Sequence, residues 1–193
     1  MYSIQNAVAS ISISEYINDY RDTDKFIGFC KACNKYGNCW SCPPYDFSTD
    51  EFLSHYKYAY IIGTKIIPSK SLSDQCHSME DSIRIGKQLI SDVRKNLDKR
   101  LIEIETQHSD SKVFFAGTCH ICDVDTCTRI IGQPCRFPDK IRYSLESFGF
   151  DIGKTTSQLL GIELKWSKDG SLPQYLTLVS ALLSNDRNIN LKI

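Results

Sequence analysis

The sequence lacks long hydrophobic runs, and it lacks an excess of charge of either sign. No apolar run in its 193 residues approaches the ~20 needed to cross a bilayer, and the N-terminus has no basic and apolar regions typical of a secretory signal. The 23 basic and 23 acidic residues balance, so the net charge favours neither nucleic acid nor an anionic membrane as a partner. We therefore expect a cytoplasmic protein that binds no nucleic acid and no membrane.

The sequence also lacks the common catalytic and cofactor-binding motifs. It contains no phosphate-binding Gly-x-x-x-x-Gly-Lys loop, no dinucleotide-binding glycine pattern, no Gly-x-Ser-x-Gly nucleophile turn and no His-Glu-x-x-His helix. The Cys-x-x-x-Cys-x-x-Cys triplet of radical chemistry on adenosylmethionine is absent too. These absences argue against the familiar cofactor-dependent enzymes.

Cysteine, by contrast, is abundant and clustered. Eight of the nine cysteines fall in two segments, which we name the N-terminal cysteine loop (residues 30–44) and the C-terminal cysteine loop (residues 117–138). In a reducing compartment, closely spaced thiols usually serve metal binding or redox chemistry. The ninth, Cys76, is interpreted as a free or half-buried thiol. The predicted metal ligands are Cys30, Cys33, Cys39 and Cys42 in the first loop and Cys119, Cys122, Cys127 and Cys135 in the second.

The spacing of the thiols bears on which metal they would bind. Four converging thiolates select zinc or an iron–sulfur cluster over harder cations. The gaps of two, four and seven residues in the C-terminal cysteine loop favour a [4Fe–4S] cluster, which presents four separate corners, with zinc as the alternative. In the N-terminal cysteine loop two Cys-x-x-Cys pairs stand five residues apart, and there zinc competes more evenly. One or two clusters are therefore expected.

Three features of the two loops stay open at this point. The loops could meet in space and share one site, which would leave some thiols free. His120 adjoins Cys119 and is a possible zinc ligand, although a position facing solvent or behind the ligands is favoured. Arg129 and Arg136 flank the last cysteines, where they would stabilise a reduced cluster, hold an anionic substrate, or form ordinary surface ion pairs.

The pattern of apolar residues indicates an α+β protein (α/β-like) in one domain spanning 1–193, with a sheet of about four strands. A long amphipathic helix is expected over 78–106, where apolar residues recur every three or four positions, and its charges at 92–100 are interpreted as a solvated face. Shorter helices are expected at 11–20, 50–56, 139–147 and 154–160. Strands are expected at 58–67, 112–116, 162–166 and 174–183, the last two joined by a turn at Asp169-Gly170.

Across most of its length the chain resembles a family of cysteine-rich, predicted metal-binding proteins named domain of unknown function 2284. The N-terminal part of the resemblance is Cys30-x-x-Cys33-x-x-Tyr36-Gly37, Trp40 and Cys42-Pro43-Pro44. The C-terminal part is Ala116-Gly117-x-Cys119-x-x-Cys122, Cys127, Pro134-Cys135-Arg136-x-Pro138 and residues 144–151. The resemblance implies metal binding by the cysteines, as an iron–sulfur centre, and it implies no particular reaction.

The chain departs from the family pattern at two cysteines. Cys39 stands where the pattern requires no cysteine, and Cys127 is displaced by an insertion relative to a tighter Cys-x-x-Cys-x-x-Cys. If Cys39 is dispensable, the N-terminal cysteine loop offers three thiolates and leaves one iron position open.

These observations lead to three hypotheses. The first is an iron–sulfur protein that transfers electrons to a redox partner protein or a small molecule, since one-electron chemistry needs no acid, base or nucleophile. The second is an enzyme in which Cys30, Cys33 and Cys42 present an open iron to a small substrate. The third is a structural or interaction module stabilised by zinc.

Overall fold

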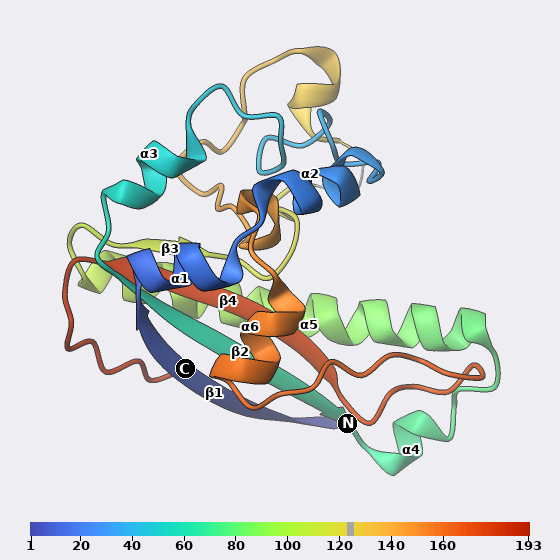
Figure 1. Cartoon of the computed structure of the whole chain (residues 1–193). Helices are drawn as coiled ribbons and strands as arrows, with labels where there is room; N and C mark the ends of the chain where they lie inside the picture. The colour runs from blue at the N-terminus through green and yellow to red at the C-terminus, as the bar shows by residue number, and fades with distance from the viewer. Residues whose placement is uncertain (123–125) are drawn as a thin grey trace.

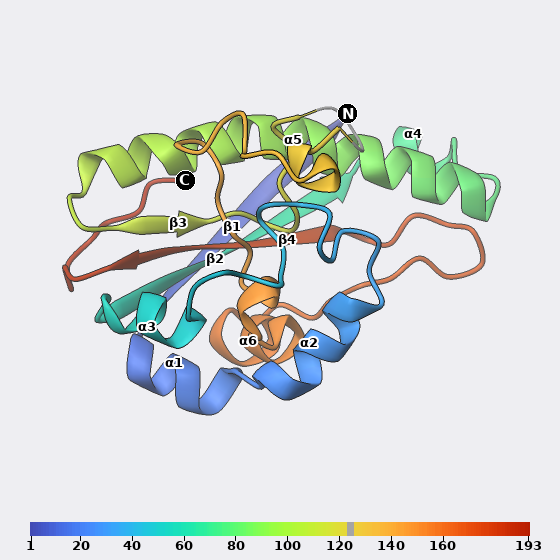
Figure 2. The ribbon, with the colours of Figure 1, turned by 90° about the horizontal axis from the view of Figure 1, so that it is seen from above.

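A computed structural model describes residues 1–122 and 126–193 of the chain. One antiparallel sheet with the order β1-β2-β4-β3 forms its centre (Figure 1). The long helix α5 lies along one side of this sheet, whereas α1, α2, α3 and α6 lie on the opposite side (Figure 2). The predicted α+β fold, with four strands and a long helix, is confirmed. The strands are β1 (Tyr2–Ser12), β2 (Tyr58–Pro68), β3 (Lys112–Phe114) and β4 (Leu176–Ser184).

A hydrophobic core lies on each face of the sheet, and strand β2 contributes side chains to both. The strand lies between β1 and β4, as its dense apolar sequence predicts, and its side chains alternate between the two faces of the sheet. Ile62 and Ile66 pack in the core under α5, whereas Ala59 and Ile61 pack in the core on the opposite face. The second core is rich in aromatic side chains, which come from the segments on either side of the cysteine loops.

Helix α5 (Met79–Gln107) has the predicted bounds to within a residue. Ser78 begins it, because its side chain accepts a hydrogen bond of 3.1 Å from the backbone N–H of Asp81. The interpretation of 92–100 as a solvated face is wrong at two positions, since Arg94 and Asp98 are 9% and 5% exposed. Among residues 1–122 and 126–193, no helix combines the length and the apolar character that a membrane span requires.

Within the part of the chain that the structure describes, one of the four expected strands is absent, and one of the four observed strands is not among those expected. Residues 162–166 form no strand, because the side chains of Leu160 and Ile162 pack onto the face of β2, where Gly63 has no Cβ to exclude them. The turn at Asp169-Gly170 is present, but it does not connect two paired strands. The strand after it, β4, pairs with β2 and β3 instead. The fourth strand is instead β1, which pairs with β2 along its whole length. Both faces of this edge strand carry polar residues. The alternation of apolar and polar residues that is typical of a strand is therefore weak in its sequence.

The helix expected at 139–147 is also wrong. The backbone N–H of Phe115 donates to the carbonyl oxygen of Tyr143 at 2.8 Å, which draws this segment alongside the end of β3. The Arg142 side chain donates to the carbonyls of Asp139 and Ile141, which therefore bond to a side chain instead of closing helical turns. Only the short 3-10 helix η2 (Glu146–Phe148) forms there, and Gly149 ends it with a φ of 88°.

The remaining helices are short, and they carry or support the cysteine loops. The expected helices at 11–20, 50–56 and 154–160 correspond to α1, α3 and α6, with boundaries shifted by a few residues. Helix α2 leads directly into the N-terminal cysteine loop, and the 3-10 helix η1 lies within the C-terminal cysteine loop. Their bounds are α1 (Ile13–Tyr20), α2 (Thr23–Lys31), α3 (Thr49–Ser54), α4 (Lys70–Ser73), η1 (Thr128–Ile131) and α6 (Ile152–Leu159).

Candidate metal centre

The two cysteine loops pack against each other at the top of Figure 1, far apart in sequence and adjacent in space. The Arg129 guanidinium donates to the carbonyl oxygens of Cys39 at 2.9 Å and Cys42 at 2.6 Å, and also to that of Pro44. It lies 5.1 Å from the ring of Trp40, whose indole N–H donates to the carbonyl of Gln133 at 3.1 Å. Arg129 therefore fastens one loop to the other rather than forming a surface ion pair.

The thiols divide between two cavities, and the division differs from the grouping in the sequence. One cavity, of about 210 Å³, is lined by Cys30, Cys33 and Cys42, and we name it the Cys30 cavity. The other, of about 700 Å³, is named the Cys119 cavity and is lined by five thiols. Four of these are the cysteines of the C-terminal loop and the fifth is Cys39, so the lining thiols are Cys39, Cys119, Cys122, Cys127 and Cys135.

Cys39 and Cys42 line different cavities although their thiols hydrogen-bond to each other and the backbone N–H of Cys42 donates to the carbonyl oxygen of Cys39 at 3.0 Å. Ser41 stands between them in the chain and is 2% exposed. Its hydroxyl is 3.4 Å from the Cys39 sulfur and 3.9 Å from the Cys42 sulfur, and it accepts a hydrogen bond of 3.1 Å from the backbone N–H of Cys119. A single buried hydroxyl thus contacts thiols of both cavities.

The acidities of these thiols follow from the same contacts. Hydrogen bonding with Cys42 lowers the pKa of Cys39 to about 5, and the same contact together with burial raises the pKa of Cys42 well above its usual range. The two thiols therefore titrate as a coupled pair. Burial raises the pKa of the Cys119 thiol to about 11, so this thiol is protonated at neutral pH without a cation nearby.

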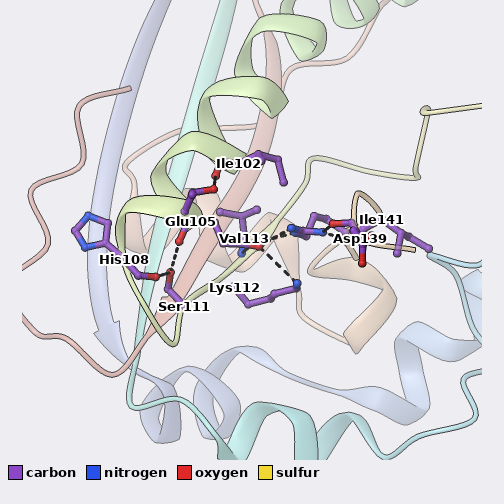
Figure 3. A network of polar contacts seen from close by, with 10 residues as sticks. Ile102, Glu105, His108, Ser111, Lys112, Val113, Asp139 and Ile141 are labelled. Atoms are coloured by element: carbon purple, nitrogen blue, oxygen red, sulfur yellow. Dashed lines mark hydrogen bonds and ion pairs between the residues drawn. The ribbon is translucent and has the colours of Figure 1, made fainter. Parts of the chain in front are cut away.

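Glu105 of α5 fixes both ends of the C-terminal cysteine loop (Figure 3). Its carboxylate accepts the backbone N–H of Val113 at 2.7 Å, in the strand that enters the loop. It also accepts Nε of Arg142 at 2.9 Å and Nη2 at 2.5 Å, in the segment that leaves the loop. The side chains of Glu105 and Arg142 are 14% and 6% exposed, so this bidentate pair is shielded from solvent.

His120 bonds to a carboxylate behind the Cys119 cavity. Its Nε2 lies 2.5 Å from Oδ2 of Asp98, which is also 3.4 Å from Nη2 of Arg94. Arg94 in turn donates to the carbonyl oxygen of Thr118 at 2.9 Å. His120 also lines the Cys119 cavity, so the expectation that it faces solvent or lies behind the ligands stays a prediction. The contact of Asp98 with His120 is not predicted from the sequence, because Asp98 stands among other charged residues of a helix and nothing in the pattern distinguishes it from them.

Glu146 is the second acidic residue that the sequence does not single out. It lines the Cys30 cavity, and its Oε2 atom is buried without a hydrogen-bond partner in the structure. Burial raises the pKa of this carboxyl group, although its own backbone, Ser144 and Arg94 each oppose the shift. Its one sequence signal is its place in the segment 144–151 that resembles the predicted metal-binding family.

The donor chemistry of both cavities suits a soft metal. All nine cysteines lie in the described part of the chain and none forms a disulfide. Within residues 1–122 and 126–193, no three His, Cys, Asp or Glu side chains already converge on one point as metal ligands would. Thiols around one cavity nevertheless provide the ligand type that zinc and iron–sulfur centres require, so the residues fit such a group by their chemistry.

Comparison with protein families agrees with this chemistry. A family model described as "Predicted metal-binding protein (DUF2284)" matches residues 16–184, which include all nine cysteines. Comparison with curated proteins and with solved structures gives no significant match.

Proposed function

This chain belongs to the DUF2284 family of predicted metal-binding proteins, and from that premise we propose that it is an iron–sulfur protein that transfers electrons. The proposed ligands of a [4Fe–4S] cluster are Cys119, Cys122, Cys127 and Cys135. A second centre is proposed at Cys30, Cys33 and Cys42. The clustered, free thiols favour a reducing, cytoplasmic setting, with a redox protein or a small molecule as the partner and no role for nucleic acid or membranes.

The observation that carries this proposal is the gathering of all four cysteines of the C-terminal loop around one cavity. Their irregular spacing suits a cluster with separate corners better than a single zinc ion. Glu105 of α5 bonds to the segments that enter and leave the loop. These bonds restrict the positions of the loop that carries the thiols.

The surroundings of these thiols suit a charged centre. The backbone N–H of Phe137 donates to the Cys135 sulfur at 3.4 Å, and Arg129 lines the neighbouring surface next to Cys135. Hydrogen bonds to cysteine sulfur and nearby cations tune the potential of iron–sulfur centres. A bound cluster would supply one-electron transfer, and these groups would stabilise its negative charge.

A second candidate function is favoured by the Cys30 cavity. It is lined by three cysteines and by polar side chains, among them Thr118, Ser144 and Glu146. A metal held there by three thiolates has a position that a small substrate can occupy, and the protein would then act as an enzyme at this cavity.

The test of the main proposal is the metal content of protein purified without oxygen. We expect about four irons and four sulfides per cluster, with visible absorption that dithionite bleaches. Zinc without sulfide or colour would reject the proposal in favour of a structural zinc module.

Replacing single cysteines assigns the site. Cys122→Ser is expected to remove the iron and sulfide of the Cys119 cavity, because a hydroxyl is a poor substitute for a thiolate ligand. Cys76→Ser is the matched control, since Cys76 lies outside both cavities and donates to the carbonyl oxygen of Gly170 at 2.9 Å. Loss of iron from the Cys76 variant would contradict the ligand assignment, as would full retention in the Cys122 variant.

A further inference from the structure

Glu146 brings a carboxylate to the cavity that has three cysteines. Oε2 of Glu146 is buried and has no hydrogen-bond partner among the residues that the structure describes. Glu146 lines the same cavity as Cys30, Cys33 and Cys42. The carboxyl group and the three thiols therefore belong to one site.

A buried carboxylate oxygen without a partner is costly to the fold, even though the backbone N–H of Glu146 and the Ser144 side chain hydrogen-bond to the same carboxyl group. A buried ionised group is normally paired with an opposite charge or bound to a metal, and otherwise it takes up a proton. No ion pair of Glu146 is found within residues 1–122 and 126–193, and Arg94 acts on it only as a nearby charge. A cation in the Cys30 cavity would satisfy this oxygen.

The residues next to Glu146 are packed in the core. Its neighbour Leu145 is fully buried and Phe148 is 1% exposed, both in the aromatic core. Gly149, one residue beyond η2, accepts a hydrogen bond of 2.9 Å from the backbone N–H of Asp22, which begins the helix that carries Cys30. Glu146 and Cys30 are thus placed by two elements that are bonded to each other.

We propose that Glu146 is a metal ligand in the Cys30 cavity, completing a site of three thiolates and one carboxylate with Cys30, Cys33 and Cys42. This inference rests on the proposed function, because it assumes that the cavity holds iron. A carboxylate is a harder ligand than a thiolate, so iron would exchange this ligand more readily than its sulfur ligands, and a small oxygen-donor substrate could take its place.

The experiment compares three variants by ⁵⁷Fe Mössbauer spectroscopy of anaerobically loaded protein and by the rate of iron loss to a chelator. In the wild type we expect one iron whose spectrum indicates an oxygen ligand. Glu146→Cys is expected to convert this iron to the spectrum of an all-sulfur site. Glu146→Gln is expected to lower the affinity of the Cys30 cavity for iron by about 10- to 100-fold. Glu163→Gln is the control, since this carboxylate is exposed and bonds to Lys165.

The outcomes separate the two proposals. Wild-type protein without iron and sulfide would overturn the proposed function and this inference with it. Iron and sulfide at the expected level, with spectra unchanged in both Glu146→Gln and Glu146→Cys, would overturn the inference alone. The Glu146→Cys variant guards against a folding defect of the other substitution, because it supplies a ligand of its own.

Discussion

Ser41 is the residue at which the two cavities come into contact. Its hydroxyl is 3.4 Å from the Cys39 sulfur and 3.9 Å from the Cys42 sulfur, and it accepts the backbone N–H of Cys119. A buried hydroxyl with three neighbours of this kind is held in position. This small polar side chain therefore links residues that line both cavities.

A second single residue, Glu105, is expected to support the C-terminal cysteine loop. Glu105→Gln leaves the Arg142 guanidinium without its bidentate partner in a shielded position, which costs about 3–5 kcal/mol of the free energy of unfolding. The measurement is urea denaturation of the metal-free protein. Glu103→Gln is the matched control on the same helix, because Glu103 pairs with Arg100 in solvent and its loss costs about 0–1 kcal/mol. Equal effects of the two substitutions would contradict the role assigned to Glu105.

At this scale the sequence indicates some residues of the candidate site and not others. The cysteines are indicated because their spacing is itself typical of metal ligands. Asp98 and Glu146 are not, since each acquires its neighbours through folding: Asp98 meets His120 across 22 residues, and Glu146 lines a cavity with cysteines of the N-terminal cysteine loop. The place of Cys39 in the lining of the Cys119 cavity likewise depends on folding, and local sequence does not specify it.

At the scale of elements, helix α2 and the 3-10 helix η2 are in close contact at Gly149. This glycine has a φ of 88°, and a Cβ atom built on it would lie 2.9 Å from Cα of Thr23, the first residue of α2. The positive φ and the close approach both require glycine. The contact holds the helix that carries Cys30 against the element that carries Glu146.

Gly149→Ala is therefore expected to lower the free energy of unfolding by about 1–3 kcal/mol, from backbone strain and from displacement of α2. Gly28→Ala is the contrasting control, because Gly28 lies inside α2 with no heavy atom near its Cβ position. It is expected to raise stability by about 1 kcal/mol, since alanine is the better helix former. Thermal unfolding of both variants checks the pair, and a stable Gly149→Ala protein would contradict the close contact.

Elements differ in how well the sequence predicts them, for physical reasons. Helix α5 is predicted closely because its apolar stripe repeats over many turns and Ser78 marks its start. Strand β1 is missed because it lies at the sheet edge and mixes polar and apolar residues on both faces. Residues 139–147 have a helical pattern, but hydrogen bonds from Phe115 and Arg142 hold them in an irregular path. Tertiary contacts override local preference there.

At the scale of the whole molecule, the two cysteine loops lie beside one another above the sheet in Figure 1, and residues of both loops line each of the two cavities. This arrangement assigns different roles to two cysteines that the sequence places in one group. Cys39→Ser is expected to leave the iron of the Cys30 cavity unchanged, because Cys39 lines the other cavity. Cys42→Ser is expected to remove it, because Cys42 lines the Cys30 cavity. Iron and sulfide analysis of the two variants provides the comparison, and the reverse result would contradict the division of the thiols.

The hydrogen bonds that Arg129 donates to carbonyls of the N-terminal cysteine loop have a consequence for transplanting the site. Self-contained metal motifs, such as zinc fingers, fold around their ion as short peptides. Here the loop at 30–44 takes its shape from a guanidinium that comes from η1, some ninety residues later in the chain. A peptide of residues 30–44 grafted onto another scaffold would lack that guanidinium, and its carbonyl oxygens at Cys39, Cys42 and Pro44 would lose their donor. The proposed metal centre is therefore a property of the complete chain and not of an isolated loop.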